Sequence, residues 1–279
     1  MKQTVIFLFF SAALAPLFLA GCSSTKEIQV LPPEQRFEAA MEKFNNGDYL
    51  DAIEDFKIIT VQYPGSTVAD KAQFYLGECR YERGEYILSA SEFDLLIRTM
   101  PSSPLVPKAR YMRAMSYYEL SPRAQLDQKY TREAVDDFQS FIEYSPNDSL
   151  VKDAEQKIVE LDDKLAKKQY DDGMLYYRLE YYKAAIVYFD YVLEHYHDSQ
   201  YADDAQLGKA RALFQRKHYD ESLDAVKVFL AKYPGSDLLP QVKKLESEIE
   251  QAIPKKTGEA ASGSSMKSTS SAGDAEWQR

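Results

Sequence analysis

Small and aromatic residues recur along this chain at fixed spacings. The frame is a small residue, an apolar residue four positions later and, in most copies, a proline eight positions after that. Its copies are Ala52/Phe56/Pro64, Ser89/Phe93/Pro101, Ala134/Phe138/Pro146, Ala185/Phe189/His197 and Ser222/Val226/Pro234. A second small residue stands 20 residues earlier in the third copy and 12 earlier in the others: Ala40, Gly77, Ala114, Gly173 and Ala210. We infer five related repeats.

Apolar positions inside a repeat follow the period of an α-helix. Ile53, Phe56 and Ile59 share one helical face. Small residues let two helices approach closely, aromatic residues fill the space between them, and proline ends the second helix. Each copy therefore predicts a helix pair. The pairs must stack, because one pair cannot bury its own apolar face.

This design resembles the tetratricopeptide repeat. The second copy fits best, with Leu76-Gly77, Tyr81, Gly84-Glu85-Tyr86, Phe93 and Pro101. Later copies replace the turn glycine with Glu180 and Lys217. The resemblance implies an all-α fold, a right-handed α-solenoid of five tetratricopeptide-like helix pairs with a long linking helix and a C-terminal capping helix.

Two insertions interrupt the regular frame. Extra residues at 121–130 predict an extended loop in the third repeat. About four turns of additional helix fit before the fourth repeat, where Gly173 is the only breaker between residues 150 and 178. We expect one long helix there. It would join an N-terminal block of three repeats, residues 34–148, to a C-terminal block, residues 149–253.

The segment after the fifth repeat predicts a final amphipathic helix that caps the apolar end of the stack. Its apolar positions are Leu238, Val242, Leu245, Ile249 and Ile253. Residues 254–279 are rich in Ser, Gly, Ala and Lys, and we expect a disordered tail. Residues 22–33 are expected to form a short tether.

The first residues have the pattern of an export signal. A positive charge precedes an apolar run, Val5–Leu19, that ends in Leu19-Ala20-Gly21-Cys22. This motif resembles the bacterial lipobox. The resemblance implies a cleaved signal peptide at residues 1–21, S-diacylglycerol and N-palmitoyl chains on Cys22, and, from Ser23, an outer-membrane destination. The alternative is an ordinary secreted protein that is cut near Gly21 and keeps a free thiol.

Composition narrows the function classes. A formal net charge of −10 without a long basic run argues against nucleic acid as the partner. Two cysteines exclude a disulfide-stapled scaffold, and Cys79 is expected to be a small core residue. His195 and His197 lie two positions apart and so face different sides of a helix. No nucleophile-elbow, zinc-protease or phosphate-loop motif occurs. We expect no catalytic residue, no metal and no cofactor beyond the lipid on Cys22.

One face of the first helices in repeats one to three predicts a binding groove. Its residues are Phe37, Met41, Phe44, Phe74, Tyr81, Tyr111, Met115 and Tyr118. An apolar groove of this kind suits an extended peptide with aromatic side chains. The alternative is that these residues form the core between helices.

The lipobox, the tether and the five repeats together resemble the BamD family (also ComL or YfiO), the lipoprotein subunit of the outer-membrane β-barrel assembly (BAM) machinery. The resemblance covers residues 19–253, and the segments Ala72–Leu76 and Glu119–Pro122 are family-like. It implies a scaffold at the periplasmic face of the outer membrane. Its N-terminal repeats would receive signals of unfolded outer-membrane proteins. Its C-terminal repeats would bind the POTRA region of BamA, beside other BAM subunits.

The candidates for the BamA interface lie on the first helices of repeats four and five: Arg178, Arg211, Phe214 and Arg216. Arginine suits an interface because its guanidinium pairs carboxylates bidentately. Each arginine has the alternative of a solvated surface charge. Three other functions stay open: a periplasmic scaffold for peptidoglycan or cell-division proteins, a glycan-uptake lipoprotein and an enzyme such as a glycosidase.

Overall fold

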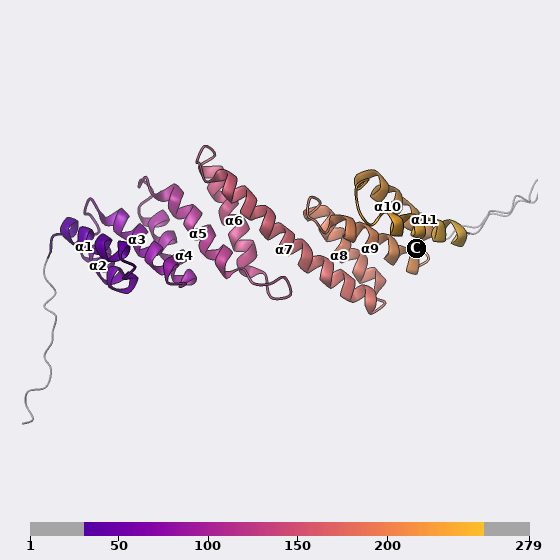
Figure 1. Cartoon of the computed structure of the whole chain (residues 1–279), viewed down its shortest axis with the longest axis horizontal. Coiled ribbons are helices and arrows are strands. Elements are labelled where there is room, and N and C mark those ends of the chain that lie inside the picture. Colours follow the sequence, from indigo (N-terminus) through magenta and orange to yellow (C-terminus); the bar gives the residue numbers. More distant parts are fainter. Residues whose placement is uncertain (1–30, 254–279) are drawn as a thin grey trace, which may run out of the picture. The chain divides into compact units, whose positions relative to one another are not determined.

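The computed structural model describes residues 31–253, and Figure 1 traces its helices. The predicted signal peptide at 1–21, Cys22, all but the last residues of the tether, and the predicted tail at 254–279 lie outside the described residues. Within the described range the chain forms α-helices and no strand. The predicted all-α class is confirmed.

The helices follow one another with short connections. They are α1 (Pro33–Asn45), α2 (Tyr49–Gln62), α3 (Ala69–Glu82), α4 (Tyr86–Thr99), α5 (Val106–Leu120), α6 (Lys129–Tyr144), α7 (Val151–Arg178), α8 (Tyr182–His195), α9 (Ala202–Gln215), α10 (Tyr219–Lys232) and α11 (Leu239–Ala252). None of these helices is long and apolar enough to cross a membrane.

The chain divides into two compact units inside α5, between Ser116 and Tyr117. In the first unit each helix from α1 to α4 packs against the next one in the chain. α5 contributes Ala109 to the core between α3 and α4. In the second unit α6 to α11 pack in sequence. The predicted block boundary at residue 148 differs from this division and stays a prediction.

Buried small residues hold the paired helices close together. Ala40, Ala52, Ala114, Ala134, Ala185, Ala210, Ser89 and Ser222 are all fully or almost fully buried. The Ser89 hydroxyl donates a hydrogen bond to the Gly77 carbonyl at 3.0 Å, and Ser222 donates to Ala210 at 2.8 Å. In repeats two and five the small-residue frame of the sequence therefore marks the contact between the two helices.

Phe189 of α8 packs against two glycines in the second unit. A methyl group added at Gly173 of α7 would meet its ring at 2.8 Å, and one added at Gly208 of α9 would meet it at 2.7 Å. Real Cβ atoms do not approach a ring carbon that closely. The position of Phe189 thus requires glycine on the helices on both sides of it.

A Schellman motif ends the first helix of four repeats. After α1 the Gly47 amide donates to the Phe44 carbonyl at 3.0 Å, and the Asp48 amide donates to the Lys43 carbonyl at 2.9 Å. The same pair of bonds closes α3, α7 and α9. The motif requires a left-handed residue, and Gly47 supplies it with φ +82°.

Two of these turns carry a left-handed residue that is not glycine. Glu180 after α7 has φ +63°, and Lys217 after α9 has φ +61°. A Cβ in this region crowds the following carbonyl, which costs about 1 kcal/mol. The substitution of the turn glycine, visible in the sequence, thus leaves strained backbone at corresponding places of repeats four and five.

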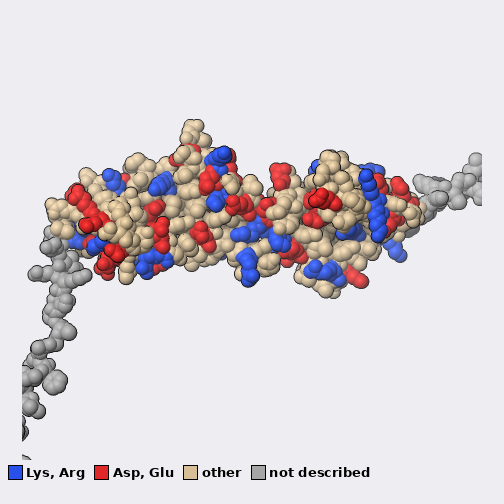
Figure 2. All heavy atoms as spheres, in the orientation of Figure 1, with Lys and Arg blue, Asp and Glu red and all other residues tan. Residues whose placement is uncertain are grey.

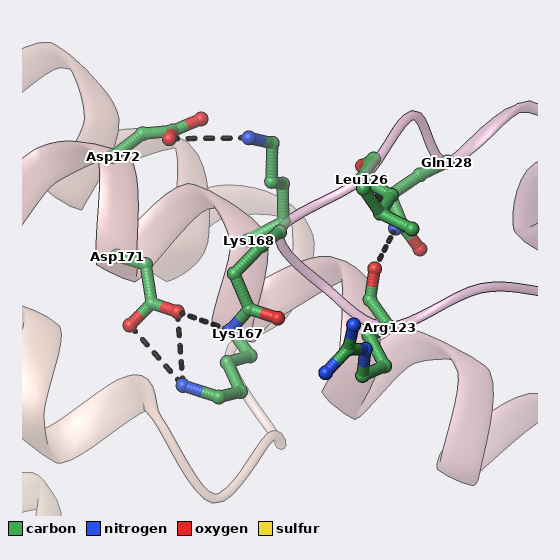
Figure 3. Close-up of polar contacts among 8 residues, drawn as sticks. Arg123, Leu126, Gln128, Lys167, Lys168, Asp171 and Asp172 are labelled. Carbon is green, nitrogen blue, oxygen red and sulfur yellow. Dashed lines mark hydrogen bonds and ion pairs between the residues drawn. The ribbon is translucent and has the colours of Figure 1, made fainter.

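The insertion in the third repeat is an ordered loop, residues 121–128 (Figure 3). The buried Gln128 amide donates to the carbonyls of Arg123 at 2.9 Å and Leu126 at 3.0 Å, and its oxygen accepts from Thr131 at 2.7 Å. The predicted loop is confirmed, and one buried glutamine organises it.

The predicted long helix and capping helix are both present. α7 runs unbroken over 28 residues, and in its second half Lys167 and Lys168 pair with Asp171 and Asp172 one turn later (Figure 3). α11 packs on α9 and α10, and its residues Val242, Leu245 and Ile249 are buried. The helix covers an apolar end that repeat five leaves open.

Candidate functional site

Three of the predicted groove residues lie half-buried on α1. Phe37, Met41 and Phe44 pack against the core that α1, α2 and α3 share. The Phe37 ring lies 5.7 Å from that of Phe56, and the Phe44 ring lies 5.2 Å from that of Tyr75. Each side chain therefore contributes to the core with one part and leaves another part at the surface.

Two further groove candidates belong to the core. Phe74 is 1% exposed and packs on Phe93, with ring centroids 5.4 Å apart. Tyr111 is 9% exposed. Side chains this deeply buried present no open surface to a peptide, so these two residues are corrected to packing residues. Their position, three before the small residue, faces the neighbouring helices.

The last three candidates are half-buried residues with separate surroundings. Tyr81 packs edge-on against Tyr86 at 5.3 Å, and Met115 lies further along on α5. Tyr118 belongs to the second unit, where its hydroxyl donates to Glu160 at 2.5 Å. That hydrogen bond raises the pKa of the Tyr118 phenol, and burial adds to the shift. The peptide-binding role of the half-buried candidates stays a prediction.

The second unit carries a large hollow beside the turn between α7 and α8. Its volume is about 770 Å³. The lining residues are Tyr176, Glu180, Tyr181, Tyr182, Lys183, Ala184, Val187 and Arg216. We name it the apolar hollow, since tyrosine rings and aliphatic groups make most of its wall. The strained Glu180 stands in this wall.

A smaller hollow of about 330 Å³ lies between α9 and α11. Its lining includes the predicted interface residues Arg211 and Phe214, together with Gln241, Lys244 and Glu248. Two cations beside an aromatic ring suit a partner that offers both a carboxylate and an apolar side chain. We name it the Arg211 hollow.

Three of the four interface candidates line the two hollows, and the fourth is exposed elsewhere. Arg211 donates to the Gln241 amide oxygen at 2.8 Å in the Arg211 hollow, and Phe214 lies beside it. Arg216 lines the apolar hollow, and Arg178 is exposed at the end of α7. Within residues 31–253 neither Arg178 nor Arg216 forms an ion pair, so both guanidinium groups remain available to a partner.

Burial raises the pKa of a carboxylate on α9, that of Asp204. Burial and the adjacent Asp203 raise the pKa of Asp204, and the Arg211 guanidinium opposes that rise. On the face that Figure 2 shows, acidic and basic side chains are interspersed with uncharged ones.

The apolar hollow was not predicted from the sequence. The feature of the sequence that could have indicated it is two pairs of tyrosines, at 176–177 and 181–182. They flank the turn where Glu180 replaces glycine. The repeat pattern accounts for Tyr177 and Tyr182 as packing residues. It does not account for Tyr181 and Val187, which are 64% and 63% exposed.

Two of the three histidines lie at the end of α8 and just beyond it. The His195 ring lies tilted against that of Tyr191, with ring centroids 4.2 Å apart, and His197 lies exposed beside Asp198. In the part of the chain that the structure describes, no group of three His, Cys, Asp or Glu side chains is arranged to hold a metal ion.

Comparison with known proteins gives a consistent result. A family model, YfiO, described as "Outer membrane lipoprotein", matches residues 30–205. The chain is 26% identical over 222 residues to the outer membrane protein assembly factor BamD of Rickettsia prowazekii, covering 79% of this chain and 88% of that protein. It is 24% identical over 187 residues to the BamD of Vibrio cholerae, with 63% and 78% covered.

Solved tetratricopeptide-repeat structures resemble the chain more distantly. A repeat protein from Bacteroides fragilis is 13% identical with a TM-score of 0.44, covering 80% of this chain and 99% of that one. A second, from Parabacteroides merdae, is 19% identical with a TM-score of 0.34, covering 79% and 73%.

Proposed function

Since the chain belongs to the YfiO family of outer membrane lipoproteins, we propose that it is an assembly factor for outer-membrane proteins. In this role it is a scaffold subunit of the β-barrel assembly machinery and carries no catalytic centre. The observation that carries the proposal is the family match over residues 30–205, joined by relatives that are themselves named assembly factors.

The C-terminal unit is proposed to bind BamA through its POTRA region. Arg211 and Phe214 in one hollow and Arg216 in the other give it positive charge beside apolar surface. Arginine and aromatic residues dominate the binding energy of many interfaces. Arg178 and Arg216 form no ion pair among the described residues, so no existing ion pair has to break before they pair with a carboxylate of the partner.

The N-terminal unit is proposed to receive segments of unfolded outer-membrane proteins. The residues proposed for this contact are the half-buried ones on the first helices: Phe37, Met41, Phe44, Tyr81 and Met115. Their partial exposure supports the proposal, because a peptide side chain can extend an aromatic cluster that is already in place.

Attachment to the outer membrane is proposed through lipid on Cys22. One acyl chain binds a bilayer only marginally, whereas several chains hold a protein stably. Replacement of Cys22 with Ala should move the chain from the membrane fraction to the soluble fraction. Incorporation of labelled palmitate into that variant would contradict the assignment of the acylation site.

The test of the partner surface is affinity purification from membranes. Arg211→Glu/Arg216→Glu should reduce recovery of BamA by tenfold or more. A tenfold loss of affinity corresponds to about 1.4 kcal/mol of binding free energy. The control is Lys152→Glu/Lys232→Glu, which reverses two exposed charges outside both hollows. Undiminished recovery with the arginine variant would reject this surface. Recovery of cell-division proteins in place of BamA would favour a periplasmic scaffold for that process.

A further inference from the structure

The apolar hollow exposes large side chains that no described residue covers. Tyr181 and Val187 remain 64% and 63% exposed although they line a space of about 770 Å³. The Tyr176 ring, also in the lining, is held in place by stacking on Tyr188, with centroids 5.2 Å apart and planes at 17°. A preformed apolar space of this size accommodates one large aromatic side chain.

The rim of the hollow offers positive charge. Lys183 and Arg216 line it, and within the described residues neither side chain forms a hydrogen bond or an ion pair. Glu180 is the one acidic residue in the lining. The apolar lining suits an aromatic side chain, and the two cations suit acidic residues next to it in the sequence.

Such a sequence lies in the chain itself, beyond the described residues. Asp274, Glu276 and Trp277 stand close together, and Trp277 is the only tryptophan of the protein. Elsewhere in residues 254–279 the side chains are mostly small or hydrophilic. The one large aromatic group of this segment thus comes with two carboxylates.

The connecting chain is long enough to reach the hollow. Ile253, the last described residue, lines another hollow of about 370 Å³ together with Lys217 and His218. Lys217 directly follows Arg216, which lines the apolar hollow. Twenty-four positions separate Ile253 from Trp277. A chain of that length has a root-mean-square span of roughly 25–30 Å. A tethered segment within such reach has an effective concentration in the millimolar range.

We propose that Trp277 docks in the apolar hollow of its own chain, with Asp274 and Glu276 against Lys183 and Arg216. The segment covers the exposed tyrosines. Any partner that contacts Arg216 must first displace it, so the segment competes within the molecule for this surface. The proposal does not depend on the identity of that partner.

The fluorescence of Trp277 tests this directly, because the full chain holds no other tryptophan. In the purified full-length protein the emission should be blue-shifted relative to a synthetic peptide of residues 262–279. Quenching by acrylamide should be several-fold weaker than for the peptide. Emission and quenching equal to those of the free peptide would overturn the proposal.

Two valines provide a matched pair of variants. Val187 lines the hollow and Val159 on α7 does not, yet both are 63% exposed. Val187→Asp should return emission and quenching to the values of the free peptide, whereas Val159→Asp should leave them unchanged. An equal response of the two variants would reject docking at this hollow.

A second variant keeps the test valid if Val187→Asp disturbs the fold. Asp274→Lys/Glu276→Lys leaves the repeats untouched and should release Trp277 to the same extent. The blue shift should be independent of protein concentration. A shift that appears only as concentration rises would assign the hollow to the segment of a second copy and overturn docking within one chain.

Discussion

A methyl group at Gly77 would lie 2.7 Å from the ring of Phe93, across the contact between α3 and α4. Phe93 is fully buried, and its ring also packs on Phe74. The ring therefore cannot move aside without disturbing the core. This contact explains why the repeat pairs a very small residue on one helix with an aromatic residue on the next.

Gly77→Ala should lower the free energy of unfolding by about 1–2 kcal/mol. Overpacking a core costs about 1–3 kcal/mol, and the better helix propensity of alanine returns less than 1 kcal/mol. Urea denaturation measures the difference. Gly65→Ala is the control, because nothing lies within 4 Å of its added methyl group. Equal stability of the two variants would contradict the role of the Gly77 contact.

Glycine at the two strained turns should stabilise the protein. Glu180→Gly and Lys217→Gly should each raise the free energy of unfolding by roughly 0.5–1 kcal/mol, since glycine adopts a positive φ without a steric penalty. Thermal and urea denaturation measure the gain. Asn46→Gly, at a position with φ −83°, should bring no gain. A loss of stability at residue 180 or 217 would mean that the side chain makes a compensating contact.

The Cys79 thiol should be unreactive while the protein is folded. It is fully buried, and burial raises its pKa to about 12, so almost no thiolate exists near neutral pH. A Cys22→Ser variant isolates this thiol for titration with a maleimide. We expect no labelling under native conditions and complete labelling in denaturant. Fast labelling of the folded chain would contradict the packing of α3.

The ion pairs of Glu85 should make stability depend on pH. Glu85 is the N-cap residue of α4, and hydrogen bonds from Arg80 and Arg83 hold its pKa below the ordinary 4.5. The stabilising contribution is complete above pH 4.5 and is lost as the pH falls through the lowered native pKa.

Glu85→Gln should therefore be less stable than the parent at pH 7, by up to about 1 kcal/mol for partly exposed pairs. The difference should vanish as Glu85 becomes protonated in the parent. Urea titrations across this range measure both curves. A difference that persists unchanged in strong acid would mean that the glutamine acts through packing and not through charge.

Much of the fold follows from residues that leave few alternatives. Gly77 and Gly173 mark close helix contacts, and the absence of breakers before Arg178 marks the long α7. The capping helix follows from apolar residues such as Val242, which only a stacked neighbour can bury. Each feature depends on local spacing, and local spacing is what a sequence displays.

The site was harder to predict, because the helical period does not separate two apolar faces of one helix. Phe74 and Phe37 occupy the same repeat position, yet Phe74 has helices on both sides and is buried, whereas Phe37 lies on the first helix and keeps part of its surface. The apolar hollow depends on the contact of three elements. No spacing within one helix reveals that Tyr181 and Val187 stay exposed.

The most direct test of the assembly function is depletion of the protein in its own host. The account predicts that folded outer-membrane β-barrel proteins, detected by their heat-modifiable mobility in gels, decrease while unfolded precursors accumulate. The wild-type chain should restore folding, and Arg211→Glu/Arg216→Glu should not. Normal levels of folded β-barrel proteins after complete depletion would contradict the proposed function.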